Sequence, residues 1–204
     1  MTRSSGACAA VWGRRIGPGS LVLVSGPSGA GKDSLLDRVR GLNAGDPRIA
    51  FPRRIVTRPV SRFEDHDSAT AEEFDRILEN DGLAFWWTAH GLRYGLPASV
   101  DEMIGAGRCV VCNVSRTVIT PLRERYENVV AVLITAPHDI LAARLAARGR
   151  SSDGELQHRM TRTIAQTPDF DAVIENSGTI EDGAAKLQRA IHRQLNSACR
   201  VPSG

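Results

Sequence analysis

The sequence predicts an α/β fold in which a parallel β-sheet is flanked by helices. Apolar runs typical of strands alternate with helical stretches along most of the 204 residues. The two clearest strands, Cys109 to Asn113 and Val129 to Thr135, lack polar alternation, as parallel strands covered on both faces do. A third run, Leu21 to Val24, ends in a glycine-rich turn that leads into a helix, which is the order found in doubly wound sheets.

The other elements follow in chain order. Lys32 to Val39 is predicted as a helix because its leucines and valine fall on one face. The segment Thr70-Ala71-Glu72-Glu73 has the pattern of a capping box, which indicates a helix that runs through Leu78 and ends at Asn80-Asp81-Gly82. Short strands are predicted at residues 53–56, 83–88 and 172–174. Further helices are predicted at residues 100–104, 138–147, 155–165 and 181–195.

Length and composition fit one ordinary globular domain, since 42% of the residues are hydrophobic and the formal net charge is only +3. We expect a single domain at 20–197, between a flexible leader at 1–19 and a loose tail at 198–204. No run of about 18 apolar residues occurs, so no membrane span is predicted. The four cysteines form no zinc pattern, and Cys109 and Cys112 are expected on opposite faces of one strand. Reduced thiols in a cytoplasmic protein are the expectation.

The strongest motif is Gly26-Pro27-Ser28-Gly29-Ala30-Gly31-Lys32, directly after a predicted strand and before a predicted helix. Its glycines let backbone N–H groups wrap a polyphosphate, the start of the helix favours an anion, and Lys32 reaches the outer phosphates. The motif therefore predicts a P-loop that binds ATP; a glycine-rich turn without a ligand is the alternative. The predicted nucleotide-binding residues are Gly26, Pro27, Ser28, Gly29, Ala30, Gly31, Lys32, Asp33 and Ser34.

The position after Lys32 departs from the usual P-loop pattern. It is normally Ser or Thr, whose hydroxyl binds magnesium, and here it is Asp33. A carboxylate is a stronger magnesium ligand, but it adds negative charge beside the phosphates. The hydroxyl of Ser34 could take that place only if the register shifted.

Three further segments carry clustered arginines or other polar groups: 53–62, 90–95 and 144–162. On a helix, Arg144 and Arg148 share one face, and Arg159 and Arg162 share another. Clustered arginines can hold a substrate phosphate bidentately and neutralise charge on a transferring phosphoryl group. Solvated helix faces are the other interpretation, since arginine is common on protein surfaces.

Together these motifs resemble the guanylate-kinase-like P-loop kinases from Leu21 to about Leu195. The resemblance rests on the P-loop, Thr57-Arg58-Pro59, Tyr94-Gly95 and the Arg-Leu-x-x-Arg-Gly segment at 144–149. It implies a P-loop kinase fold with an acceptor-binding insertion at about 52–97 and a lid at about 144–160. It assigns the acceptor phosphate to Arg54, Arg58 and Tyr94. It assigns phosphoryl transfer to Lys32, Arg144, Arg148 and Arg159.

Departures from guanylate kinases indicate a different acceptor. Those enzymes carry a glutamate that reads the guanine edge where this chain has Phe85, and a phenylalanine cannot accept those hydrogen bonds, so GMP is disfavoured. Residues 31–36, 55–58, 87–92 and 113–116 instead resemble the ribose 1,5-bisphosphate phosphokinases, which make 5-phosphoribosyl 1-diphosphate with ATP in phosphonate breakdown. His66 falls where guanylate kinases have a phosphate-binding tyrosine, so it is a candidate for the sugar bisphosphate; an exposed loop histidine is the alternative.

A carboxylate has also changed places relative to guanylate kinases, which have a P-loop hydroxyl and an aspartate where this chain has Asp33 and Asn113. We hypothesise that Asp33 holds Mg²⁺, directly or through water, while Asn113 and Arg116 face the acceptor. The expected cofactors are ATP and Mg²⁺, and the expected partner is a small phosphorylated sugar, with no nucleic acid, no membrane, and a monomer or homodimer. A nucleoside monophosphate kinase and a non-catalytic binding module remain the alternatives.

Overall fold

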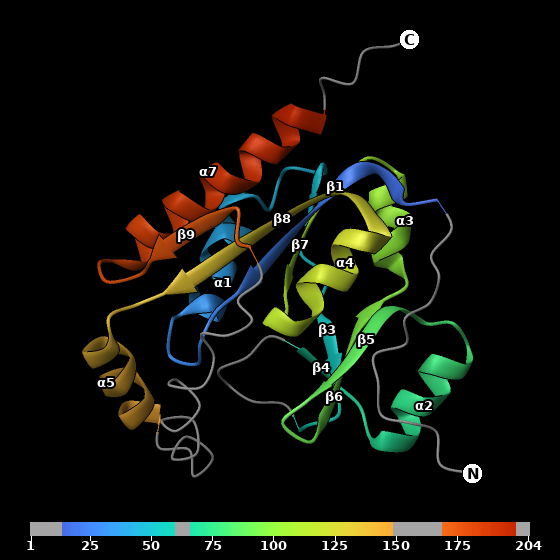
Figure 1. Cartoon of the computed structure of the whole chain (residues 1–204), viewed down its shortest axis with the longest axis horizontal. Helices are drawn as coiled ribbons and strands as arrows, with labels where there is room; N and C mark the ends of the chain where they lie inside the picture. Colours follow the sequence, from blue (N-terminus) through green and yellow to red (C-terminus); the bar gives the residue numbers. More distant parts are fainter. Residues whose placement is uncertain (1–13, 60–65, 149–168, 199–204) are drawn as a thin grey trace.

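A computed structural model describes residues 14–59, 66–148 and 169–198, and it has two β-sheets (Figure 1). All neighbouring strands of the larger sheet are parallel. Its strand order is β2 (Ile49–Ala50), β7 (Cys109–Asn113), β1 (Ile16–Ser25), β8 (Tyr126–Thr135) and β9 (Ala172–Glu175). The predicted parallel α/β architecture is therefore confirmed, and β1, which leads into the P-loop, lies at the centre of the sheet.

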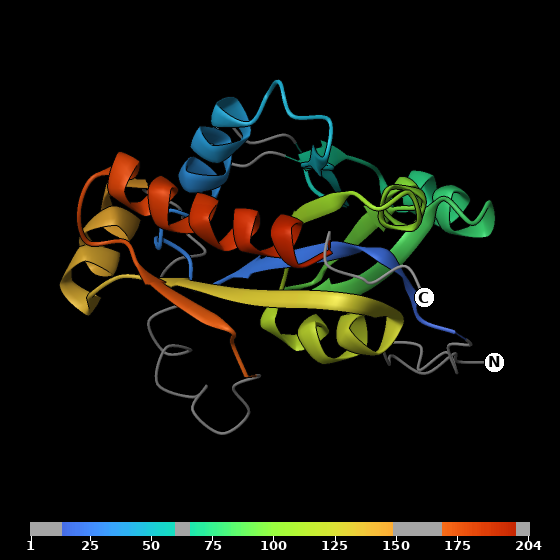
Figure 2. The same cartoon turned by 90° about the horizontal axis from the view of Figure 1, so that it is seen from above.

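Both faces of the larger sheet are buried, each in its own hydrophobic cluster. Helices α1 (Lys32–Leu42) and α7 (Ile180–Ala198) contribute to one cluster, and α3 (Ser99–Gly105) and α4 (Ile119–Arg125) contribute to the other. Figure 2 shows α1 and α7 above the sheet and α4 below it. Cys109 belongs to the first cluster and Cys112 to the second, so their predicted placement on opposite faces is correct.

The smaller sheet is inserted between β2 and α3. Its order is β4 (His66–Ser68), β3 (Arg54–Val56), β6 (Leu92–Pro97) and β5 (Leu83–Ala89). Helix α2 (Ala71–Glu79) packs on one face, where the rings of Phe74 and Trp86 meet edge to face at 6.4 Å. The smaller sheet and α5 (His138–Arg148) lie at opposite ends of the molecule, with the P-loop between them (Figures 1 and 2).

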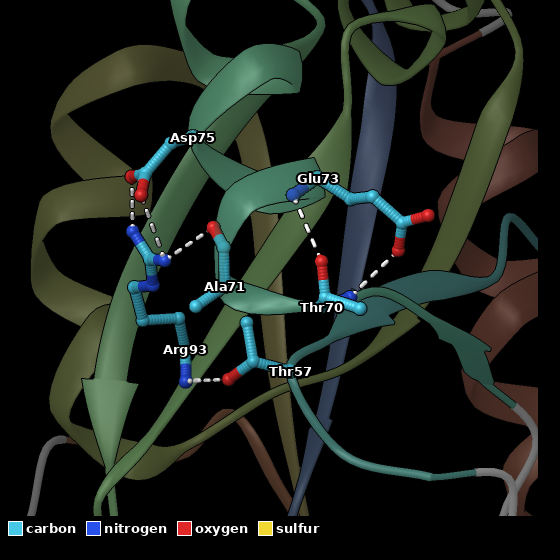
Figure 3. Close-up of polar contacts among 6 residues, drawn as sticks. All are labelled: Thr57, Thr70, Ala71, Glu73, Asp75 and Arg93. Carbon is cyan, nitrogen blue, oxygen red and sulfur yellow. Dashed lines mark hydrogen bonds and ion pairs between the residues drawn. The ribbon is translucent and has the colours of Figure 1, made fainter.

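Helix α2 begins with the predicted capping box (Figure 3). The Thr70 hydroxyl accepts the Glu73 amide at 3.1 Å, and the Glu73 carboxylate accepts the Thr70 amide at 2.7 Å. These two bonds satisfy backbone donors that the helix itself cannot use.

Several elements differ from the sequence-based expectations. Strands β2, β4 and β6, helix α4 and the short 3₁₀ turn η1 (Arg116–Val118) were not predicted, because each is short, polar or interrupted by glycine or proline. Strand β1 begins at Ile16, inside the segment expected to be a leader. The helix predicted at 155–165 lies outside the described residues.

An ion pair between α3 and α4, on the face of the larger sheet that these helices cover, leads to a prediction about stability. The Asp101 carboxylate accepts the fully buried Tyr126 hydroxyl at 2.5 Å and pairs with Arg125. Burial, followed by the neighbouring Asp101, raises the pKa of Tyr126. We expect Asp101→Asn to cost about 2 kcal/mol of unfolding free energy, because it removes the carboxylate charge that pairs with the largely buried Arg125 guanidinium. Urea denaturation followed by circular dichroism measures the loss.

The control is Asp75→Asn, which breaks the more exposed pair with Arg93. That change should cost clearly less stability than Asp101→Asn, because water screens the exposed pair. Equal losses in the two variants would contradict the argument from burial.

Candidate active site

The P-loop joins β1 to α1 at the carboxyl end of the central strand. Gly26 has φ +148°, and a Cβ there would lie 1.9 Å from the Ile134 carbonyl oxygen. Gly31 has φ +84°, and a Cβ there would lie 2.5 Å from the Asn176 amide nitrogen. Neither position accommodates a side chain, so the loop can make its turn only with glycine at both. The turn places the amino end of α1 at the carboxyl edge of the sheet, where α/β proteins bind ligands.

Lys32 is already oriented by the loop it belongs to. Its Nζ donates to the carbonyl oxygens of Gly26 at 2.8 Å and Pro27 at 2.9 Å. These bonds fold the side chain back along the loop, so its charge lies beside the anion-binding backbone. The chain has only two lysines among 26 basic residues, the other being Lys186.

Asp33 and Asn113 meet across the site. The Asn113 Nδ2 donates to the Asp33 Oδ1 at 2.9 Å, which joins the first turn of α1 to the last residue of β7. Both residues were predicted near the site, but a contact between them was not. Asn113 therefore holds Asp33 as well as lining the pocket described next.

A pocket lies on the β7 side of the P-loop. Arg54, from β3 of the smaller sheet, lines it, and its guanidinium is 5.7 Å from the centre of the Tyr94 ring. Tyr94 in turn stacks on Trp87, with ring centres 5.4 Å apart and planes 10° apart. The aromatic pair thus supports the arginine at the pocket wall. The lining residues are Asp33, Leu36, Asp37, Arg40, Phe51, Pro52, Arg54, Leu96, Val111, Cys112 and Asn113.

The other predicted acceptor residues are less directly placed. Arg58 follows β3 and is half-buried, and Arg116 lies in η1, half-buried but not among the residues that line the pocket. His66 lies beside Arg54 in the sheet and is completely buried, so the alternative of an exposed loop histidine is wrong. Phe85 is buried opposite Leu96 in the hydrophobic cluster between the two sheets.

The polar segment at 90–95 has a structural part as well. Figure 3 shows Arg93 directed at α2, where it pairs with Asp75 and donates to the Ala71 carbonyl at 2.6 Å. The Arg93 amide also donates to the Thr57 hydroxyl at 2.8 Å. Arg93 therefore anchors the start of the Thr57-Arg58-Pro59 segment and does not point toward the pocket.

One of the predicted lid arginines, Arg144, contacts the P-loop region in this structure. Arg144, in α5, donates through Nη1 to the Asn176 carbonyl at 3.1 Å and lies 3.5 Å from the Gly29 carbonyl oxygen. Arg144 thus contacts the P-loop. Arg148 is the last residue of α5, and Arg159 lies outside the described residues.

Asn176, which directly follows β9, was not predicted from the sequence. It is 5% exposed, and its Nδ2 donates to the Ala30 carbonyl in the P-loop at 2.8 Å. The signal available in the sequence was a polar run at the carboxyl end of a parallel strand. Asn176 also borders a second hollow, on the β9 side of the loop. Its lining residues are Glu175, Asn176, Ser177, Gly178, Asp182, Gly183, Ala185, Lys186 and Arg189.

The residues present fit a magnesium ion that arrives with a nucleotide. Within 14–59, 66–148 and 169–198, no group of three His, Cys, Asp or Glu side chains could hold a metal on its own. Mg²⁺ in kinase sites is held by one or two carboxylates plus substrate phosphates and water. Asp33, one residue after Lys32, meets that requirement.

No helix within the described residues is long and apolar enough to cross a membrane.

Comparison with known proteins finds relatives that share one name. The chain is 54% identical to "Ribose 1,5-bisphosphate phosphokinase PhnN" of Rhodopseudomonas palustris, over 80% of this chain and 83% of that protein. It is 47% identical to the protein of the same name from Bradyrhizobium diazoefficiens, over 88% of this chain and 91% of that protein. Among solved structures, the guanylate kinase of Anaplasma phagocytophilum has a TM-score of 0.61 at 20% identity and covers 91% of this chain and 90% of its own.

At 20% identity the structural likeness establishes the fold alone, and it agrees with the two-sheet arrangement described above. The family model described as "Guanylate kinase" matches residues 19–194, which includes the P-loop, the smaller sheet and α5. The predicted resemblance is thereby confirmed, and the chain belongs to the guanylate kinase family.

Proposed function

We propose that this enzyme transfers the γ-phosphoryl group of ATP to the 1-phosphate of ribose 1,5-bisphosphate, giving 5-phosphoribosyl 1-diphosphate and ADP. The observation that carries the proposal is the pocket beside the P-loop, where Arg54 and Asn113 lie across from the start of α1. An arginine there suits an acceptor phosphate. The names of relatives up to 54% identical support the sugar bisphosphate as acceptor.

Phe85 is the argument against a guanine nucleotide. It is 7% exposed and part of the hydrophobic cluster, so its side chain offers no polar group to a base edge. A site that lacks the matching hydrogen-bond partners leaves the polar groups of a purine unpaired, which disfavours binding strongly. A sugar phosphate makes no such demand at this position.

The topology supports separate sites for the two substrates. The acceptor pocket lies at β7 and the second hollow lies at β9, on opposite sides of the strand that leads into the P-loop. We place the acceptor on the β7 side and the nucleoside part of ATP on the β9 side. The P-loop between them holds the phosphates of ATP, next to the acceptor phosphate.

The chemistry needs positioning and charge neutralisation. An oxygen of the acceptor 1-phosphate attacks the γ-phosphorus, the bond to the β-phosphate oxygen breaks, and ADP leaves with those electrons. The attacking oxygen is already ionised near neutral pH, so no strong base is required. Lys32 and Arg144 are assigned to stabilising the charge on the transferring group. By family resemblance, Arg148 and Arg159 join them.

The remaining roles complete the proposed site. Arg54, Arg58 and Tyr94 hold the acceptor phosphates, and His66 and Arg116 remain candidates for the same task. Asp33 would hold Mg²⁺, directly or through water, with Asn113 keeping the carboxylate in place. When bound, Mg²⁺ neutralises charge on the β- and γ-phosphates. A cytoplasmic location and a monomer or homodimer remain predictions.

The test is a coupled ADP-release assay with Mg²⁺ and ATP, offering ribose 1,5-bisphosphate, GMP, AMP and dGMP in parallel. Turnover is expected on the sugar bisphosphate alone, with 5-phosphoribosyl 1-diphosphate identified by phosphorus NMR. Turnover on GMP would show that the acceptor pocket has been misassigned. Tight ATP binding without turnover on any acceptor would favour a non-catalytic module.

A further inference from the structure

Asn176 connects three parts of the nucleotide site. Its backbone amide donates to the Thr135 carbonyl at 2.7 Å, which fixes it to the end of β8. Its side-chain Nδ2 donates to the Ala30 carbonyl at 2.8 Å, and its own carbonyl accepts from Arg144 at 3.1 Å. With 5% of its surface exposed, the side chain is held inside the protein.

The bond to Ala30 determines which way one P-loop peptide faces. In a planar trans peptide the carbonyl and the following N–H point in opposite directions. Because Asn176 holds the Ala30 carbonyl, the Gly31 N–H must point away from Asn176. A P-loop presents backbone donors of this kind to phosphate. The contact is tight, since a Cβ on Gly31 would come within 2.5 Å of the Asn176 Nδ2.

We propose that Asn176 is a positioning residue that keeps the P-loop in its phosphate-binding conformation before ATP arrives. The inference rests on the proposed function only in that the loop binds the phosphates of ATP. Asn176 acts through the backbone of Ala30 and Gly31, on the β9 side of the site. Its loss therefore weakens nucleotide binding and leaves acceptor binding on the β7 side unchanged.

The test compares Asn176→Ala with Asn43→Ala. Asn43 is a matched control because it is also buried, at 8% exposed, and its Nδ2 donates to the Val39 carbonyl at 2.7 Å at the far end of α1. We expect Asn176→Ala to raise the Kd for ADP and the KM for ATP about tenfold, as loss of one buried hydrogen bond does. The KM for the acceptor should stay within about twofold. Asn43→Ala should lower Tm and leave both nucleotide constants unchanged.

A second variant covers the case in which the alanine variant is too unstable to measure. Asn176→Asp has the same size, but its ionised carboxylate cannot donate to the Ala30 carbonyl and repels it. It should weaken ADP binding more than alanine does. Calorimetry with ADP measures this without any acceptor, so the result stands even if the acceptor proves to be a nucleotide. Unchanged ADP affinity in both Asn176 variants, or an equal loss in Asn43→Ala, would overturn the proposal.

Discussion

Lys32→Met is expected to lower kcat about 10³-fold while leaving the fold intact. The ammonium group is held over the P-loop by the Gly26 and Pro27 carbonyls, so it is in place before substrate binds. Such preorganised charge acts mainly on the transition state, where the transferring phosphoryl group is most charged. We therefore expect the loss in kcat rather than in the KM for the acceptor. Steady-state kinetics with both substrates varied separates the two.

Lys32→Arg is expected to be little more active than Lys32→Met, although it keeps the positive charge. The guanidinium is a planar fork and larger than an ammonium, and it does not fit two carbonyls at 2.8 and 2.9 Å in the same way. Arg38→Met serves as the control, because Arg38 is an exposed cation on the same helix that lies 3.9 Å from Glu181. Its activity should be within about twofold of wild type. A Lys32→Arg variant with near-normal kcat would refute the point-charge argument.

The parts of the fold that could be predicted are those with strong local signals. The P-loop, the buried strands β1, β7 and β8 and the capping box of α2 each depend on neighbouring residues, and the structure confirms them. Strand β6 was not predicted, because Gly95 and Pro97 interrupt its apolar pattern. One of its partners is β5, which precedes it directly, but the other is β3, which is distant in the sequence.

The candidate site, like the fold, could be predicted only where the signal is local. Motifs predicted which residues belong to the site, but only the fold shows which of them are in contact. Asp33 and Asn113 are 80 residues apart and Asn176 and Ala30 are 146 apart, so no local pattern relates them. Arg93 lies in a segment that the sequence predicted to be functional, but in the fold its side chain pairs with Asp75 of α2. An arginine's role is not readable from its place in a motif when several surfaces lie within its reach.

Asp33→Asn is expected to lower kcat/KM for ATP about 10²-fold and to raise the Mg²⁺ concentration needed for half-maximal rate. The change keeps the shape of the side chain and removes its charge, so it isolates the carboxylate as the feature that matters. Calorimetry of ADP binding with and without Mg²⁺ gives a readout independent of turnover. The increase in ADP affinity that Mg²⁺ causes should be smaller in the variant. Asp37→Asn, one turn further along α1, is the control and should leave the Mg²⁺ requirement unchanged.

Moving the carboxylate from position 33 of α1 to position 113 of β7 gives a stricter test of its role in binding Mg²⁺. Asp33→Ser removes the carboxylate, and adding Asn113→Asp supplies one from the strand, about one hydrogen-bond length away from where the first had been. If position along the chain is unimportant and charge at the site is what binds Mg²⁺, the double variant should recover about tenfold of the activity lost in Asp33→Ser. Asn113→Asp alone should be impaired, because two carboxylates then face each other. Full rate and an unchanged Mg²⁺ requirement in Asp33→Ser would show that Asp33 does not serve the metal, and its bond to Asn113 would then be purely structural.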